Sequence, residues 1–198
     1  MKYLLAFGLV LVLASTAFAL GDNPQVYAYV SFDAAGDPVQ NVVAPAPYTT
    51  VNAYICLGCV PGGMTTVSFL LNNAMAQCPG VMATQAFVNL LPGGLAIGDA
   101  FVNGITLAST ECMLMDPVVV GHGSYFYLGG DCCIEILDHV DYPRWVVDCN
   151  DPGLVDLYCL EGHGIVGAGV CVTPLESPCP CDSPVEDATW GGIKALYR

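Results

Sequence analysis

Cationic side chains are nearly absent from this sequence. Lysine and arginine together number 4 in 198 residues, against 18 aspartates and glutamates, and the formal net charge is −14. Such a field repels phosphate backbones and anionic membranes. The charge balance therefore argues against nucleic-acid binding and against anionic substrates. We expect the acidity to serve mainly solubility, with cation or calcium binding as the functional alternative.

Charged residues of either sign make up only 11% of the chain, whereas glycine and proline number 22 and 14. Long amphipathic helices need many charged positions, which this chain lacks. Catalytic signatures are missing as well: there is no Gly-x-Ser-x-Gly elbow, phosphate loop, dinucleotide fingerprint or HExxH motif. The sequence builds no catalytic site on its own, so a non-enzymatic protein is the favoured interpretation.

The first residues have the pattern of a secretory signal peptide. A short positive start, Met1 and Lys2, precedes the apolar run 4–13, and Ala17-Phe18-Ala19 supplies a cleavage site. The run is too short to span a bilayer, and later apolar stretches are interrupted by Gly, Pro, Asn or Asp. We expect removal of residues 1–19 and no membrane span in the mature chain. The predicted location is secreted, extracellular or at the cell surface, with the periplasm as an alternative.

Cleavage would leave about 179 residues, enough for one domain and a tail. Only Arg144, Lys194 and Arg198 would then oppose 18 acidic residues, for a net charge near −15. Repeated prolines mark an extended linker over 173–184, because proline cannot continue a central strand. The predicted organisation is a β-sandwich over 20–172, this linker, and a C-terminal tail over 185–198.

Alternating apolar and polar residues predict the strands. Within 64–71, Val67, Phe69 and Leu71 share one face, and the intervening side chains share the other. Many short strands punctuated by Gly and Pro favour an antiparallel β-sandwich. Residues 73–86 fit a strand or a short helical turn equally well. The expected strands are 26–32, 50–55, 64–71, 85–90, 100–107, 118–120, 124–128, 134–137, 145–149, 154–160 and 165–172.

Cysteine is the residue that most clearly fixes the kind of stabilisation. In an oxidising compartment the expected state of all eleven cysteines is disulfide-bonded, although an odd number leaves at least one thiol over or paired with another molecule. Adjacent Cys132 and Cys133 would point to opposite faces of a strand and take different partners. The candidates are Cys56, Cys59, Cys78, Cys112, Cys132, Cys133, Cys149, Cys159, Cys171, Cys179 and Cys181.

Two close cysteine pairs invite local bonds. Cys56-Leu57-Gly58-Cys59 has redox-motif spacing, but Pro61 follows and breaks the helix that would lower the thiol pKa. A loop-closing disulfide is therefore favoured over redox catalysis, and a zinc site lacks a second ligand cluster. Cys149 and Cys159 flank a turn and could close a hairpin.

Histidines and carboxylates supply the alternative enzymatic hypothesis, a secreted metal-dependent hydrolase. It would use His122, His139 and His163 with nearby carboxylates, but no ligand spacing supports it. His122 and His163 each stand between two glycines, which favours turns.

Calcium is the one cofactor for which the sequence offers donors, and only a weak site is expected. A solvated hairpin turn is favoured over a calcium loop, because Pro152 and Cys159 occupy positions that an EF-hand loop fills with ligands. The oxygen-bearing candidates are Asp148, Asn150, Asp151 and Asp156.

The tail places apolar and cationic residues on a short helical pattern. Trp190, Ile193 and Tyr197 would form one stripe, and Lys194 and Arg198 lie four residues apart. A helix this short is marginal alone and needs a surface to dock on. We expect it either to dock on its own domain or to be recognised by secretion or attachment machinery.

The tail sequence 190–198, Trp-Gly-Gly-Ile-Lys-Ala-Leu-Tyr-Arg, resembles the ending of a group of uncharacterised secreted bacterial proteins, and the segment 142–149 is also similar. The resemblance implies an extracellular sandwich of cohesin-like or immunoglobulin-like type and no catalytic residues. We therefore expect a structural or binding protein whose partner is a surface component or polysaccharide. Sugars could stack on exposed tyrosines, or the tyrosines could equally well just cover the face of the sheet; the candidates are Tyr27, Tyr29, Tyr125 and Tyr127.

Overall fold

The computed structural model describes residues 26–72, 78, 80–150 and 155–167. These residues form fifteen β-strands and no helix, so the predicted all-β class is confirmed. The predicted leader, linker and tail lie outside the described residues. None of the described segments forms a helix long and apolar enough to cross a membrane.

Two six-stranded sheets form the sandwich. In sheet I the order is β14-β1-β3-β9-β5, and β6 also pairs with β9. In sheet II the order is β13-β12-β4-β8-β7, and β11 also pairs with β4. The strands of sheet I are β1 (Tyr27–Ser31), β3 (Thr49–Gly58), β5 (Val81–Ala83), β6 (Val88–Asn89), β9 (Val118–Tyr127) and β14 (Cys159–Gly162). Those of sheet II are β4 (Met64–Leu71), β7 (Leu95–Asp99), β8 (Gly104–Met113), β11 (Ile136–Leu137), β12 (Trp145–Asp148) and β13 (Val155–Leu157).

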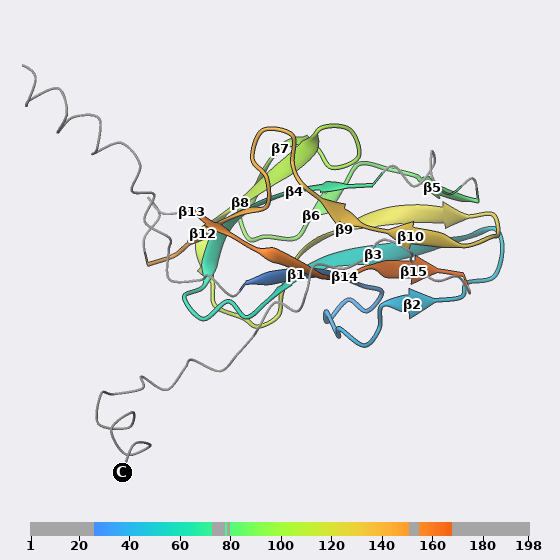
Figure 1. The fold of residues 1–198 in the computed structure, drawn as a ribbon, viewed down its shortest axis with the longest axis horizontal. Helices are drawn as coiled ribbons and strands as arrows, with labels where there is room; N and C mark the ends of the chain where they lie inside the picture. Colours follow the sequence, from blue (N-terminus) through green and yellow to red (C-terminus); the bar gives the residue numbers. More distant parts are fainter. Residues whose placement is uncertain (1–25, 73–77, 79, 151–154, 168–198) are drawn as a thin grey trace, which may run out of the picture.

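A small third sheet has the order β10-β15-β2. Its strands are β2 (Val42–Val43), β10 (Cys132–Ile134) and β15 (Gly164–Val166). Pairing is antiparallel throughout except for β1 with β14 and β15 with β2. The long strands β3 and β9 run along the long axis of the molecule (Figure 1).

One continuous core lies between sheets I and II. Sheet I contributes Val30, Ile55 and Val120, and sheet II contributes Phe69 and Leu107, all at most 1% exposed. The predicted alternation along β4 is confirmed, because Val67, Phe69 and Leu71 all face this core. Burial of such side chains contributes about 1.5–3 kcal/mol each. The opposite face of sheet II is partly covered, since Ser68 is buried on it while Ile97 is exposed.

The turn predicted at Gly121-His122-Gly123 is wrong. A single strand, β9, runs through it, with Gly121 opposite Ile55 and His122 opposite Tyr54 on β3. Both positions need glycine because aromatic rings occupy the space that a side chain would take. A Cβ on Gly121 would overlap the Phe87 ring, and a Cβ on Gly123 would lie 3.1 Å from the Phe101 ring. A pattern that favours a turn locally here marks close packing across the core.

Several strand boundaries also differ from expectation. The strand predicted over 100–107 begins only at Gly104, because 100–103 form a turn in which the backbone N–H of Val102 donates to Asp99. Of the strand predicted over 85–90, only the two residues of β6, Val88–Asn89, are in a strand. The sequence pattern missed β7, an edge strand whose five residues are all exposed.

Two disulfides join distant strands. Cys78 bonds Cys132 at the start of β10, and Cys112 near the end of β8 bonds Cys149 just after β12. The Cys149–Cys159 hairpin bond that we expected is therefore not formed. Cys59, Cys133 and Cys159 are also disulfide-bonded. Adjacent Cys132 and Cys133 accordingly have different partners, as predicted.

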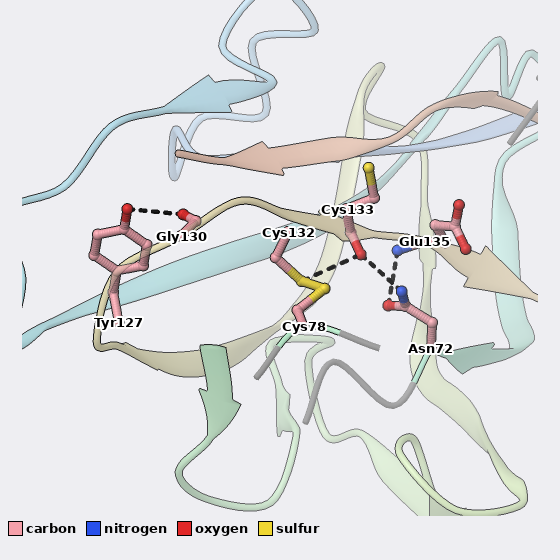
Figure 2. The surroundings of a disulfide bond; sticks show 7 residues. All are labelled: Asn72, Cys78, Tyr127, Gly130, Cys132, Cys133 and Glu135. Carbon is pink, nitrogen blue, oxygen red and sulfur yellow. Dashed lines mark hydrogen bonds between the residues drawn. A yellow bond between two sulfur atoms is a disulfide. The ribbon is translucent and has the colours of Figure 1, made fainter. Parts of the chain in front are cut away.

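Figure 2 shows the Cys78–Cys132 bond beside the side-chain hydrogen bonds by which Asn72, at the end of β4, contacts β10 and the residue after it. The Asn72 side chain donates to the Cys133 carbonyl at 2.7 Å and accepts from the Glu135 N–H at 2.9 Å. It thus continues the strand pairing where β4 ends. The neighbouring Tyr127 hydroxyl closes the turn after β9 by donating to the Gly130 carbonyl.

Cys56 is the free thiol among the described cysteines, which corrects the expected Cys56–Cys59 bond. Cys56 lies on β3 beneath Gly36 of the loop after β1, fully buried, and burial raises its pKa to about 12. Cys59 lies past the end of β3 with φ of 55°, and its backbone N–H donates to Asp116. The two residues therefore belong to different environments, and the thiol has no reactive character.

The packing of β9 gives a direct test of the fold. Gly121→Ala should lower the free energy of unfolding by about 1–3 kcal/mol, because the added methyl meets the Phe87 ring and the Val88 carbonyl oxygen. In a double-mutant cycle with Phe87→Ala, the same substitution should cost less, because only the contact with the Val88 carbonyl remains. Urea denaturation measures both values. If Gly121→Ala has no cost in either background, Gly121 is not packed against Phe87 and β6, and the β9 assignment is wrong.

Candidate functional site

A groove of about 290 Å³ lies on the outer face of sheet II. Four neighbouring strands and one loop line it. The register places Ile97, Thr106 and Ser68 in a row across β7, β8 and β4, and Val147 stands opposite Thr66. The lining residues are Thr66, Ser68, Ile97, Thr106, Tyr142, Trp145 and Val147.

No lining side chain is charged, and two are aromatic. Ile97 is 60% exposed, Tyr142 45% and Trp145 36%. The Tyr142 and Trp145 rings lie 5.0 Å apart between centroids at 45°, so they form a bent platform beside the sheet. Exposed aromatic side chains on an uncharged floor are typical of a binding surface.

Ser68 fixes this platform to the sheet. Its hydroxyl donates to the Tyr142 carbonyl at 2.6 Å and accepts from the Trp145 N–H at 3.1 Å. From the other side, the buried Tyr158 hydroxyl donates to the Ser68 carbonyl at 2.7 Å. Burial raises the pKa of Tyr158 well above its ordinary value, so this hydroxyl remains a donor.

His139 supports the platform from behind. Its Nδ1 accepts from the backbone N–H groups of Asp141 and Tyr142 at 3.0 and 3.2 Å, and its ring packs 5.2 Å from that of Tyr142. Gly104, with φ of 104°, leaves the space that the His139 ring fills. The side chain is 7% exposed. Its structural role explains a histidine that the sequence offered as a metal ligand.

The loop between His139 and Trp145 holds the one cation among the described residues, Arg144, whose Nε lies 2.7 Å from Asp138 Oδ1. Arg144 adopts φ of 48°, and its carbonyl accepts from the Tyr158 N–H. A partly exposed ion pair of this kind contributes little stability. The Arg144 cation is therefore paired with Asp138, and Arg144 is not one of the residues that line the groove.

The tyrosines first expected to bind sugars are placed differently. Tyr29, Tyr125 and Tyr127 are at most 8% exposed, and Tyr27 is half-buried. Tyr125 belongs to the core on β9, and the Tyr29 hydroxyl donates to the Gly36 carbonyl beneath the loop that covers it. Strand alternation alone did not reveal that both faces of sheet I are covered. Tyr142 and Trp145 provide the exposed aromatic surface instead.

The three histidines lie on separate segments. His122 is on β9 beside Tyr54, with its Nδ1 buried and unpartnered, and burial lowers its pKa. His163 stands between β14 and β15. Among the described residues, no three His, Cys, Asp or Glu side chains are grouped as metal ligands.

The described members of the calcium candidate set have local roles. The buried Asp148 carboxylate accepts from the Asn150 N–H and so closes the turn after β12. Asp156 lies on β13, and Asp151 is outside the described residues.

No protein-family model matches the sequence, and no curated protein matches it either. Similar solved structures are cohesin modules. One from Clostridium acetobutylicum has a TM-score of 0.49 at 12% identity, covering 73% of this chain and 91% of its own. A cohesin module of a Clostridium perfringens family 33 glycoside hydrolase has a TM-score of 0.48 at 9% identity, covering 71% and 92%. The seventh ScaB type I cohesin of Pseudobacteroides cellulosolvens has a TM-score of 0.46 at 12% identity, covering 77% and 97%. Likenesses at this level carry no statement about function.

The hydroxyl of Ser68 provides the test of the site geometry. Ser68→Ala leaves the Tyr142 carbonyl and the Trp145 N–H without their partner, which should cost about 1–3 kcal/mol in urea denaturation. The matched control is Thr66→Ala, which removes a hydroxyl two residues earlier on the same face and should stay within about 0.5 kcal/mol. Equal effects of the two substitutions would show that Ser68 does not hold the platform.

Proposed function

We propose that this chain is a non-enzymatic binding module of the extracellular or cell-surface space, and that the outer face of sheet II is its binding surface. The observation that carries the proposal is the uncharged groove with Tyr142 and Trp145 at its edge. An otherwise strongly acidic protein presents here its aromatic side chains and no charge. Charge depletion with aromatic enrichment is the compositional mark of interface centres.

The exposed apolar surface continues beyond the groove. Leu95 on β7 stands opposite Ala108 on β8, on the same outer face as Ile97, and is 58% exposed. Because β7 is an edge strand, this apolar strip is open along its outer side. Contiguous exposed apolar surface of this kind indicates an interaction site in a soluble domain.

Preorganisation supports the same proposal. Hydrogen bonds to Ser68 and His139 hold the backbone of the loop that carries Tyr142 and Trp145. A side chain that is already fixed loses less conformational entropy when a partner binds. The platform therefore has the rigidity that favours binding through few contacts.

Disulfides support the location. Bonds such as Cys78–Cys132 and Cys112–Cys149 persist in oxidising compartments and are rare in the cytosol. Together with the signal-peptide pattern of residues 1–19, they favour a secreted protein. We further propose that the tail residues Trp190, Ile193, Lys194, Tyr197 and Arg198 serve attachment or export, separately from the groove.

Co-sedimentation with cell envelopes of the producing organism tests the proposed surface. Trp145→Ala and Ile97→Lys should each reduce the bound fraction about tenfold, since truncating a central aromatic or burying a charge costs about 1.4 kcal/mol or more. Tyr48→Ala is the matched control, because Tyr48 is an aromatic residue 74% exposed outside the groove lining. Should both groove variants sediment like the parent protein, the proposed function is wrong.

A further inference from the structure

We infer that the ligand of this groove is a neutral carbohydrate, bound with a sugar ring against Tyr142 and Trp145. The inference rests on the proposed function of the surface and names its partner. Aromatic rings bury large apolar area while keeping a polar group at one end. The apolar face of a sugar ring can pack on the faces of the two aromatic rings. The sugar hydroxyls can hydrogen-bond to the polar group of the aromatic side chain.

Hydroxyl side chains on the groove floor suit the same chemistry. Thr66, Ser68 and Thr106 line it, and each hydroxyl can both donate and accept. Sugar hydroxyls have the same dual character. The Ser68 hydroxyl is already used to hold the loop, so the threonines are the groups left for a ligand.

Thr106 provides an independent observation. Its Oγ1 is buried and has no hydrogen-bond partner in the protein, although the residue lines the groove. A buried polar atom without a partner is costly and rare in native proteins. A ligand hydroxyl in the groove would satisfy this atom if binding is accompanied by a χ1 rotamer that exposes Oγ1.

Charge selects a neutral ligand. No lining residue is charged, so neither a carboxylate nor an ammonium group would find a counter-charge there. The net charge of −14 also repels phosphorylated or uronic-acid ligands at a distance. The negative net charge would attract a basic peptide at a distance, but no carboxylate lines the groove to pair with its cations there.

The size of the hollow also fits a small ligand. The groove volume of about 290 Å³ is just below the range of about 300–1,000 Å³ that is usual for small-molecule sites. The described hollow therefore fits one or two sugar units of a longer chain.

The test uses the glycan fraction released from cell envelopes by exhaustive protease digestion. In the full chain carrying Trp190→Phe, Trp145 is the single remaining tryptophan, so its fluorescence reports on the groove. The glycan fraction should change the Trp145 emission in a saturable way, and periodate oxidation of the glycan should abolish the effect.

Variants in the same background sharpen the result. Tyr142→Ala should weaken glycan binding at least about tenfold, and Thr106→Val, which removes only the hydroxyl, about five- to tenfold. Tyr48→Ala should leave it unchanged. If the glycan fraction has no effect while envelopes still bind in a Trp145-dependent way, the partner is a protein and the carbohydrate inference is wrong. Envelope binding that does not depend on Trp145 would instead overturn the proposed function itself.

Discussion

The two hydrogen bonds of the Ser68 hydroxyl are the constraint on which the rest of the site depends. They join β4 to Tyr142 and Trp145, which are 74 and 77 residues away in the sequence. Trp145 is also held as the first residue of β12, opposite Leu157 on β13, whereas the loop residue Tyr142 depends on contacts such as the one from Ser68 for its position over the outer face of sheet II. The packed core holds sheet II in place, and the Ser68 hydroxyl hydrogen-bonds the backbone of the aromatic residues to that sheet. Tyr158 and His139 strengthen the arrangement from the two sides.

Local patterns were sufficient for the fold class and for much of the strand inventory. The alternation over 64–71 predicts β4 with its exact bounds, because one face packs on a core and the other does not. The sequence-based prediction failed where contacts between residues far apart in the sequence determine the local structure. Positions 121 and 123 of β9 are glycines because Phe87 and Phe101 occupy the space that larger side chains would need. No local sequence pattern reveals these contacts. The edge strand β7 was missed because all its residues are exposed and none alternates in burial.

The proposed binding surface was harder to foresee than the fold. Tyrosines on strands offered themselves as ligand-binding candidates, but the loop after β1 covers Tyr29, and the core encloses Tyr125. In the sequence, the segment 142–149 gave a predicted strand, disulfide and calcium candidates and a resemblance to other secreted proteins, but Tyr142 and Trp145 were not among the binding candidates. Its significance comes from tertiary contacts, since Ser68 and Thr106 reach the groove from other strands. The cysteines likewise indicated a disulfide-stabilised domain, but the sequence did not reveal that Cys56 is buried under Gly36 as a free thiol.

The central proposal is that one surface of an acidic sandwich is responsible for binding. Hydroxyl-radical footprinting of the full chain, with and without envelope glycan, measures this most directly because it reports on each exposed aromatic side chain separately. Tyr142 and Trp145 should both be protected by the glycan, whereas Tyr48, which is 74% exposed outside the groove lining, should be oxidised equally in both samples. Protection of Tyr48 with unchanged oxidation of Tyr142 and Trp145 would contradict the account.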